Sequence, residues 1–152
     1  MIMKIKNSDQ EICHMKVKNW LDDLFLHDER VALSMSKDAP SFYLRYGSTL
    51  IRVGIFPRGE DGSFVYSMST VVSNCELTPT LLHYLLEENQ SKKFSGFSIS
   101  KTGQINFARN RWRKMNIEGL AASVYGVAKV ADEYDDLIIS RFGGERAFYQ
   151  LG

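Results

Sequence analysis

The spacing of apolar residues changes along this chain, and this change constrains the fold more than any other feature of the sequence. From about residue 8 to residue 25, apolar side chains recur every three or four positions, which is the period of an α-helix. Between residues 41 and 72 they recur at a period of two, which is typical of β-strands. Both periods return later in the chain, so the sequence predicts helices that pack on a sheet.

A first helix is expected to begin at about Ser8, a residue type that is common at the N-cap. Its predicted apolar stripe consists of Val17, Trp20, Leu21, Leu24 and Phe25. Three strands are expected next, at 41–46, 49–56 and 64–72, because β-branched and aromatic residues concentrate there between turn residues. A run at 31–35 is a candidate for a short strand before them. Together these strands predict an antiparallel meander.

A second helix is expected where Thr78 provides an N-cap and Pro79 the first helical residue, a position at which proline loses no hydrogen bond. Its core-facing residues are predicted to be Leu81, Leu82, Leu85 and Leu86. Asn89 is expected to close the helix. A hairpin should follow, with strands at 94–100 and 104–112 joined by a turn at 101–103.

The last and longest helix is expected from about Asn116 to Arg141, and Gly143-Gly144 follows where a left-handed C-cap is common. Its apolar face is predicted to consist of Ile117, Leu120, Val124, Val127, Ala131, Tyr134 and Ile138. The predicted order is therefore αβββαββα. We expect an α+β fold in which helices cover an antiparallel sheet, formed by one domain over residues 1–152 with a core at about 10–144 and short tails.

The balance of charge argues against a protein whose main ligand is a polyanion. Nineteen basic and 18 acidic side chains leave a formal charge of +1, so any such binding requires a local patch. Cys13 and Cys75 are the only cysteines, and we expect both to be reduced thiols. No apolar run approaches the length of a membrane span, and the N-terminus lacks the apolar region of an export signal. The chain is therefore expected to be a cytoplasmic protein that does not enter a membrane.

Several short segments, combined with the predicted order, resemble the YbjN-like bacterial family and, at the level of the fold, the type III secretion chaperones. The segments are Leu85-Leu86-Glu87-Glu88-Asn89, Phe97 and Ile99 before Lys101-Thr102-Gly103, and Ala131 to Asp136 leading to Phe142-Gly143-Gly144. The resemblance covers roughly residues 10 to 144. It implies a non-enzymatic, often dimeric protein that acts as a chaperone-like adaptor or as a regulator of signalling. Secretion chaperones are typically acidic, so the near-neutral charge favours the YbjN-like branch.

The sequence gives no indication of a metal or cofactor site. His14, His27 and His83 are scattered, and no cysteine or histidine pair has a zinc spacing. The common hydrolase, phosphate-loop and metalloprotease motifs are missing. The carboxylates Asp132, Glu133, Asp135 and Asp136 are interpreted as a solvated helix face. They would supply the acid and base of an enzyme if there were one, but we expect no catalytic residue and no cofactor.

One basic segment is a candidate contact for nucleic acid or another partner. It consists of Arg109, Arg111, Trp112, Arg113 and Lys114. Basic residues that flank an aromatic ring can follow phosphates while the ring stacks on a base, although a basic strand end has the same composition.

Small residues on the last predicted helix are a candidate subunit contact. They are Gly119, Ala122, Ser123 and Gly126. Glycine costs about 1 kcal/mol in a helix interior, so close packing on the sheet or on a second subunit is expected there. Among the aromatic and methionine residues, Tyr43, Tyr66 and Met68 are expected to fill strand faces or to line a groove or an open sheet edge.

The favoured hypothesis from the sequence is a homodimeric, chaperone-like binding module that holds a partner polypeptide on apolar sheet and helix surface. The alternative is a regulator that contacts nucleic acid through the segment from Arg109 to Lys114.

Overall fold

The computed structural model of the chain describes residues 5, 7–27, 31–35, 41–46, 49–60, 62–92, 95–111 and 117–147. Its elements are α1 (Ser8–His27), β1 (Val31–Met35), β2 (Ser41–Tyr46), β3 (Thr49–Arg58), β4 (Gly62–Ser73), α2 (Pro79–Gln90), β5 (Ser95–Ile99), β6 (Ile105–Arg111), α3 (Ile117–Phe142) and β7 (Glu145–Arg146). The α+β class is confirmed. Two strands extend the predicted order: β1, which was a candidate, and β7, which was not predicted.

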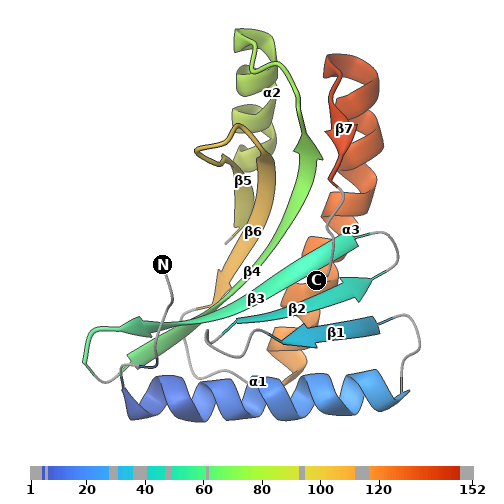
Figure 1. Cartoon of the computed structure of the whole chain (residues 1–152). Helices are drawn as coiled ribbons and strands as arrows, with labels where there is room; N and C mark the ends of the chain where they lie inside the picture. Colours follow the sequence, from blue (N-terminus) through green and yellow to red (C-terminus); the bar gives the residue numbers. More distant parts are fainter. Residues whose placement is uncertain are drawn as a thin grey trace.

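All the strands belong to one antiparallel sheet. Its order is β1-β2-β3-β4-β6-β5, and β7 pairs with the last residues of β4. The sheet is strongly twisted, so that β1 to β3 lie across the molecule while β4, β6 and β5 turn upward in Figure 1. The predicted hairpin is present as β5 and β6, with Gly103 at a φ of 82° in its turn. The meander and the hairpin therefore join into a single sheet through β4 and β6.

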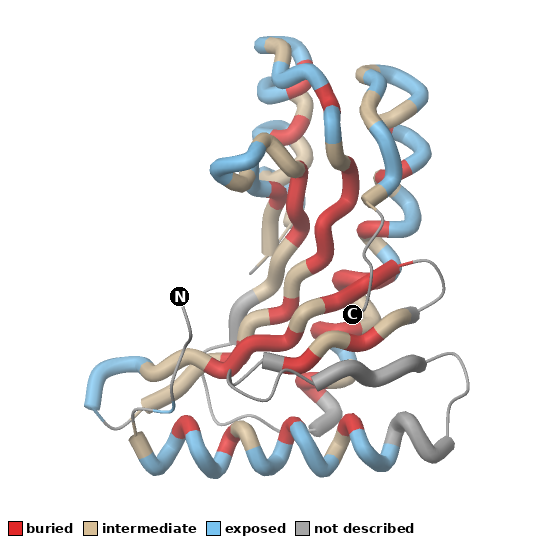
Figure 2. Tube along the Cα trace, viewed as in Figure 1, coloured by how far each residue is buried: buried red, intermediate tan, exposed pale blue. Residues whose placement is uncertain are grey.

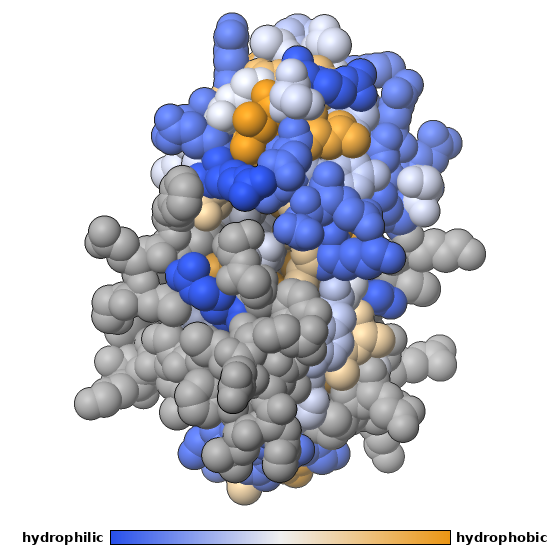
Figure 3. All heavy atoms as spheres, turned by 90° about the vertical axis from the view of Figure 1, so that its right-hand side faces the viewer, coloured by the Kyte–Doolittle hydropathy of each residue, from blue (hydrophilic) through white to orange (hydrophobic). Residues whose placement is uncertain are grey.

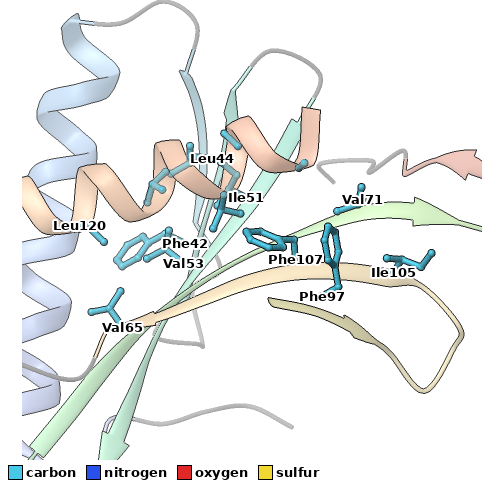
Figure 4. Close-up of a cluster of buried hydrophobic side chains, with 14 of the residues drawn as sticks. Phe42, Leu44, Ile51, Val53, Val65, Val71, Phe97, Ile105, Phe107 and Leu120 are labelled. Atoms are coloured by element: carbon cyan, nitrogen blue, oxygen red, sulfur yellow. The ribbon is translucent and has the colours of Figure 1, made fainter. Parts of the chain in front are cut away.

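The helices pack on one face of this sheet, which we call the covered face. Alternate strand residues supply it, among them Phe42, Leu44, Ile51, Val53, Ile55, Val65 and Phe107. These side chains are buried. Figure 4 shows several of them between the strands and the helices. In Figure 2 buried residues concentrate in the central strands and on the sheet-facing sides of the helices. The hydrophobic core therefore lies between the sheet and its helices.

The first helix is anchored to the far end of the β3–β4 hairpin. Its cap is Asn7 rather than the predicted Ser8, because Asn7 Oδ1 accepts the backbone N–H of Gln10 at 2.8 Å. The same side chain donates to the carbonyl of Gly62 at 2.9 Å. Gln10 is fully buried and donates to the carbonyl of Ile55 at 2.9 Å. Three members of the predicted stripe face the core, namely Val17, Trp20 and Leu21. The side chains of the other two, Leu24 and Phe25, are not among those that the structure describes.

The second helix begins as predicted, with the Thr78 side chain accepting the N–H of Leu81 and Pro79 as the first residue. The prediction that four leucines face the core is half wrong. Leu81 and Leu85 are buried, but Leu82 is 37% exposed and Leu86 is 70% exposed. Residues 81 and 85 are one turn apart and share the sheet-facing side, whereas 82 and 86 are rotated about 100° away from them.

The second helix ends at Gln90, with Ser91 as its cap, and not at Asn89 as predicted; the Asn89 side chain has a different role that the sequence did not reveal. Its carboxamide donates to the carbonyl of Phe97 at 3.0 Å and accepts the N–H of Phe97 at 2.6 Å. It therefore satisfies both outward-facing backbone groups in the middle of β5, which is the edge strand on this side of the sheet.

The third helix packs mainly on β4 and β3 and ends as predicted, because Gly143 adopts a φ of 85° and donates its N–H to the carbonyl of Ile139. Gly144 then has a φ of 96°, and a Cβ there would lie 2.7 Å from Val72 Cγ1. Only glycine fits this approach, which brings β7 back onto β4. In the described part of the chain, no helix combines the length and apolarity that crossing a lipid bilayer requires.

Candidate functional site

The second face of the sheet carries no described helix or strand, and we call it the uncovered face. Its central residues form what we call the open-face cluster. The cluster consists of Tyr43, Arg45, Arg52, Phe56, Phe64, Tyr66 and Met68. All seven side chains are half-buried. In Figure 1 this face is turned toward the viewer, and α3 lies behind the strands.

The register of three strands assembles the cluster. Arg52 on β3 lies directly between Tyr43 on β2 and Met68 on β4. Gly54 is the next β3 residue on this face, and it lies opposite Tyr66. Gly54 has no side chain and is itself buried, so this position adds no exposed apolar surface to the cluster.

The aromatic rings at one end of the cluster pack on one another. Phe56 and Phe64 form a cross-strand pair with ring centroids 5.2 Å apart and an interplanar angle of 11°. Tyr66 meets Phe56 edge-on, with 5.9 Å between the centroids. Burial raises the pKa of the Tyr66 hydroxyl, and the positive charge of Arg52 partly offsets that shift. The neutral phenol is therefore the form present near neutral pH.

Charge is distributed unevenly between the sheet and the helices. Strands β1 to β6 contain five arginines within their bounds and no aspartate or glutamate. The register places three of these arginines, Arg45, Arg52 and Arg58, on the uncovered face. The helices hold most of the acidic residues instead. The strand residues on the uncovered face are therefore aromatic and basic.

A small cavity lies at the end of the sheet that β7 reaches. Its volume is about 100 Å³, and it is lined by Thr49, Leu50, Thr70, Val71, Ala131, Asp135, Arg146 and Ala147. Ligand pockets are typically roughly 300–1,000 Å³ in volume, so this cavity is small for an organic substrate. Leu50 and Thr70 are buried here, which marks the end of the exposed part of the uncovered face.

Asp135 corrects the interpretation of the acidic run as a solvated helix face. It is only 8% exposed, whereas Asp132, Glu133 and Asp136 are exposed as predicted. Figure 3 shows the side of the molecule that lies at the right in Figure 1; among its coloured residues hydrophilic ones predominate, and the most strongly apolar ones gather mainly near the top. Arg146 Nε lies 3.7 Å from Asp135 Oδ2, and the same guanidinium binds Asp136.

Burial is the main reason why the pKa of Asp135 is raised above its ordinary value. The backbone N–H of Asp136 and the charge of Arg146 act in the opposite direction, while the carboxylates of Asp136 and Asp132 add to the increase. Asp135 and Arg146 are the charged members of the described lining of the cavity. The pair fastens β7 to α3, which is a structural role.

A second group of titratable residues connects α2 with α3. The Tyr134 hydroxyl donates to Glu88 Oε2 at 2.5 Å and accepts from Lys92 Nζ at 3.1 Å. Burial and the Glu88 carboxylate raise the pKa of Tyr134 to about 12. Its ring also packs on Phe97, with 5.1 Å between the centroids. These contacts are those of a structural tyrosine.

The basic segment predicted from the sequence is described only in part. Arg109 lies on the covered face beside α3, where its Nη1 is 3.6 Å from the position that a Cβ on Gly126 would take. Its Nε is buried and has no hydrogen-bond partner among the described residues. The backbone of Arg111 belongs to β6, but its side chain and Trp112, Arg113 and Lys114 lie outside the described residues. Contact of this segment with nucleic acid stays a prediction.

The small residues of the last helix are divided between two environments. Gly119 and Ser123 are buried, and Ser67 and Ser69 of β4 are buried small residues on the sheet beneath α3. Ala122 is exposed and Gly126 half-buried. Close packing within the chain accounts for the two buried positions, and a subunit contact stays a prediction for the others.

The cysteines and histidines are placed apart from the open-face cluster. Cys13 and Cys75 are both buried and are not joined in a disulfide, and burial raises the pKa of each thiol. His14 packs on Phe42, and burial lowers its pKa. Over the described ranges, no three side chains of the metal-ligating types come together.

Sequence reasoning named Tyr43, Tyr66 and Met68 but did not recognise the cluster to which they belong. A signal was present, because 41–46, 49–58 and 62–73 carry large apolar or aromatic residues on both alternating sets of positions. An antiparallel strand that is solvated on one face would show polar residues there.

Comparison of the chain with known proteins identifies no relative that would indicate its function. The chain matches no protein-family model, and no curated protein matches it either. The resemblance to the YbjN-like family and to the secretion chaperones therefore stays a prediction.

Proposed function

We propose that this chain is a non-enzymatic, chaperone-like binding module that holds an extended segment of a partner polypeptide on its open-face cluster. The observation that carries the proposal is the uncovered sheet face, where four aromatic rings and a methionine stay half-exposed. Contiguous apolar surface of this kind marks interaction sites on soluble domains.

Burial of the cluster would provide the binding energy. Apolar surface that is removed from water contributes about 25 cal/mol per Å², less the cost of ordering both partners. Aromatic and methionine side chains are also the residues that interfaces prefer, since they present large contact areas with few rotatable bonds. The proposal assigns no reaction to the chain.

An extended polypeptide suits the shape of this surface. The rings of Phe56, Phe64 and Tyr66 already pack on one another, so they form a continuous ridge rather than separate platforms. Side chains at alternate positions of an extended segment are about 6.8 Å apart and can contact such a ridge repeatedly.

The proposal includes a homodimer in the cytoplasm, as the family resemblance implies. Buried thiols that are not joined in a disulfide, at Cys13 and Cys75, are compatible with a reducing compartment. Leu82 and Leu86 are exposed one turn apart on α2, away from the uncovered face, and are candidates for a subunit contact. Light scattering of the purified chain measures the number of subunits, and a monomer at micromolar concentration would contradict this part.

The test of the proposed function compares two variants that each remove exposed apolar side chains. Phe64→Ser, Tyr66→Ser and Met68→Ser together change the open-face cluster, whereas Leu82→Ser and Leu86→Ser together change α2. Binding to a reduced, alkylated and permanently unfolded polypeptide is measured by fluorescence anisotropy. We expect the triple variant to lose at least tenfold in affinity and the double variant to bind like the wild type.

Chemical shift mapping on the wild-type protein covers the case in which the triple variant fails to fold. Addition of the unfolded polypeptide should shift amide signals in β2, β3 and β4 and leave those of α2 unchanged. Shifts confined to α2, or equal affinity of the triple variant and the wild type, would contradict the proposal.

A further inference from the structure

The side of α1 that points away from the sheet carries exposed apolar side chains. Ile12 is 53% exposed and Met15 is 57% exposed, whereas Val17 and Leu21 on the opposite side of the helix are fully buried. In Figure 2 the exposed residues of α1 follow the side turned away from the sheet. Residues three positions apart are neighbours on a helix surface, so Ile12 and Met15 form one apolar patch.

The residues around this patch have the spacing of a helix that packs on another helix. Ser8, Ile12, Met15 and Asn19 follow one another at intervals of four, three and four residues, and all four are exposed. This spacing is that of the contact positions of a coiled coil, at which two helices lie side by side. We call these four residues the α1 seam. Its shape suits a second helix.

The charged residues beside the α1 seam are available for contacts with another molecule. Glu11 and Lys18 are seven residues apart and therefore lie on the same flank of the seam, whereas Lys16 lies on the other flank. All three are exposed. Within the part of the chain that the structure describes, none of their side chains forms a hydrogen bond or an ion pair. One flank of the seam thus presents both an unpaired carboxylate and an unpaired ammonium group.

We propose that the α1 seam is the contact between two copies of this chain, which pack their α1 helices antiparallel. A two-fold axis between residues 13 and 14 places Ile12 opposite the partner's Met15. The same axis keeps each flank on its own side, so Glu11 faces the partner's Lys18. These two residues are offset by about 3 Å along the helix axis, which long side chains can span. The inference rests on the homodimer of the proposed function, because it names the surface of that dimer.

The charge pattern favours a second copy over a partner of another kind. A flank that carries one acidic and one basic residue is complementary to itself in the antiparallel arrangement, since each copy supplies Glu11 to one ion pair and Lys18 to the other. An acidic or a basic partner surface would satisfy only one of these two charges and would repel the other. The α1 seam is therefore matched best by its own copy.

The α2 helix, which also exposes leucines, fits a subunit contact less well than α1. On α2 the charged groups His83 and Glu87 already contact each other, with 2.8 Å between Nε2 and Oε1. The α2 helix has 12 residues and α1 has 20, which correspond to lengths of about 18 and 30 Å. The longer helix offers more contact surface along its axis and charges without partners in the chain.

A dimer formed through α1 leaves the open-face cluster accessible. In Figure 1 the free side of α1 is turned away from the sheet, whereas the uncovered face of the sheet is turned toward the viewer. The helix is also fixed to the end of the β3–β4 hairpin, since Asn7 donates to the carbonyl of Gly62 and Ser63 donates to Asp9. Each copy in the dimer would therefore keep its own cluster free for a polypeptide.

Sedimentation equilibrium of the full chain over a series of protein concentrations measures the dissociation constant of the dimer. The variant Ile12→Ser/Met15→Ser removes the apolar part of the seam, and Leu82→Ser/Leu86→Ser on α2 is its matched control. The variant Glu11→Lys places two lysines opposite each other. Two further variants add a second change to Glu11→Lys: Lys18→Glu, or Lys16→Glu as the control.

We expect Ile12→Ser/Met15→Ser to weaken dimerisation about tenfold or more, and Leu82→Ser/Leu86→Ser to leave it unchanged. Glu11→Lys should weaken it about fivefold, because an attraction becomes a repulsion at two symmetry-related contacts. The added Lys18→Glu should restore wild-type dimerisation, and the added Lys16→Glu should not. Restoration by a second substitution cannot result from misfolding of the variant.

The other outcomes overturn the inference or separate it from the proposed function. If the wild type dimerises and Ile12→Ser/Met15→Ser dimerises equally well, the subunits meet elsewhere and the inference is wrong. If Lys16→Glu restores the dimer instead of Lys18→Glu, the helices are parallel and the antiparallel pairing is overturned.

A wild type that stays monomeric at every concentration would contradict both the homodimer and the inference. Polypeptide binding is measured independently, with the triple serine variant of the open-face cluster. If the chain dimerises through α1 but binds no unfolded polypeptide, the holding function fails while the inference stands.

Discussion

The two faces of this sheet are made by the same strands and differ in almost every physical respect. On the covered face, β3 contributes Ile51, Val53 and Ile55, which are fully buried. On the uncovered face, the alternate residues of the same strand include Arg52 and Phe56, which are half-buried. One strand therefore serves a core and a surface at once, because successive side chains point in opposite directions.

This difference shows what each face requires. The covered face is built from aliphatic and aromatic residues that fill the core, with small serines on β4 where α3 packs closely, so the shape of the side chains decides its composition. The uncovered face instead combines rings, a methionine and arginines that tolerate partial contact with water. The first composition is that of an interior, and the second is typical of the centre of a protein interface.

The largest expected effect comes from removing one large side chain from each face. Ile55→Ala should lower the free energy of unfolding by about 2–5 kcal/mol, because it leaves a cavity in the core. Phe64→Ala on the uncovered face should cost only about 1–2 kcal/mol, the value of a half-buried ring and its stacking partner. Urea unfolding measures both. Equal losses would show that the uncovered face contributes to folding as much as the core does.

A smaller effect, of opposite sign, is expected where the covered face meets α3. Gly126→Ala should stabilise the chain by about 0.5–1 kcal/mol, since a Cβ there meets Arg109 Nη1 only at an ordinary 3.6 Å and alanine favours the helix. Ala122→Gly, at an exposed position of the same helix, is the control and should cost a similar amount. Destabilisation by Gly126→Ala, measured by urea unfolding, would show that close approach of the helix and not propensity governs this position.

The comparison of the faces also explains how far the sequence could be interpreted. Its periods predicted the three helices and the strands of the meander and hairpin, because each element repeats its pattern over several residues. The N-cap of the first helix was predicted at Ser8 but is Asn7. Both residue types can cap a helix, and only the hydrogen bond from the N–H of Gln10 distinguishes them. The strand β7 was missed because its two residues are too few to carry a period.

The candidate site was harder to predict than the fold, for a physical reason. Tyr43, Arg52 and Tyr66 lie on three different strands, and only the register of β2, β3 and β4 brings them to one face. In β4 the sequence was misleading about which alternating set faces the helices, because the buried set contains Ser67 and Ser69 whereas the other set is largely apolar. The exposure of Leu82 and Leu86 could not be predicted for a similar reason, since a pattern of leucines does not indicate how many sides of a helix are covered by the rest of the protein.

The smallest expected effect concerns the charge that each side of the sheet holds. The uncovered face carries half-exposed arginines, whereas the helix side buries the carboxylate of Asp135 beside Arg146. Because burial raises the pKa of Asp135, the folded chain takes up this proton more readily than the unfolded chain. The contribution of this group to stability is therefore fully present below its unfolded pKa and is lost as the pH rises through the raised folded value.

Asp135→Asn removes this titration while keeping a side-chain oxygen for the N–H of Asp136. Relative to the wild type, the variant should be most favoured near neutral pH, and the difference between their unfolding free energies should shrink as the pH falls toward 3.8. Urea unfolding of both proteins between pH 7 and about 3.5 measures that difference, because the other titrating groups are common to both. A difference that grows on acidification would mean that Arg146 lowers the pKa of Asp135 more than burial raises it. The environment of Asp135 on the helix side of the sheet would then favour the ionised carboxylate over the protonated one.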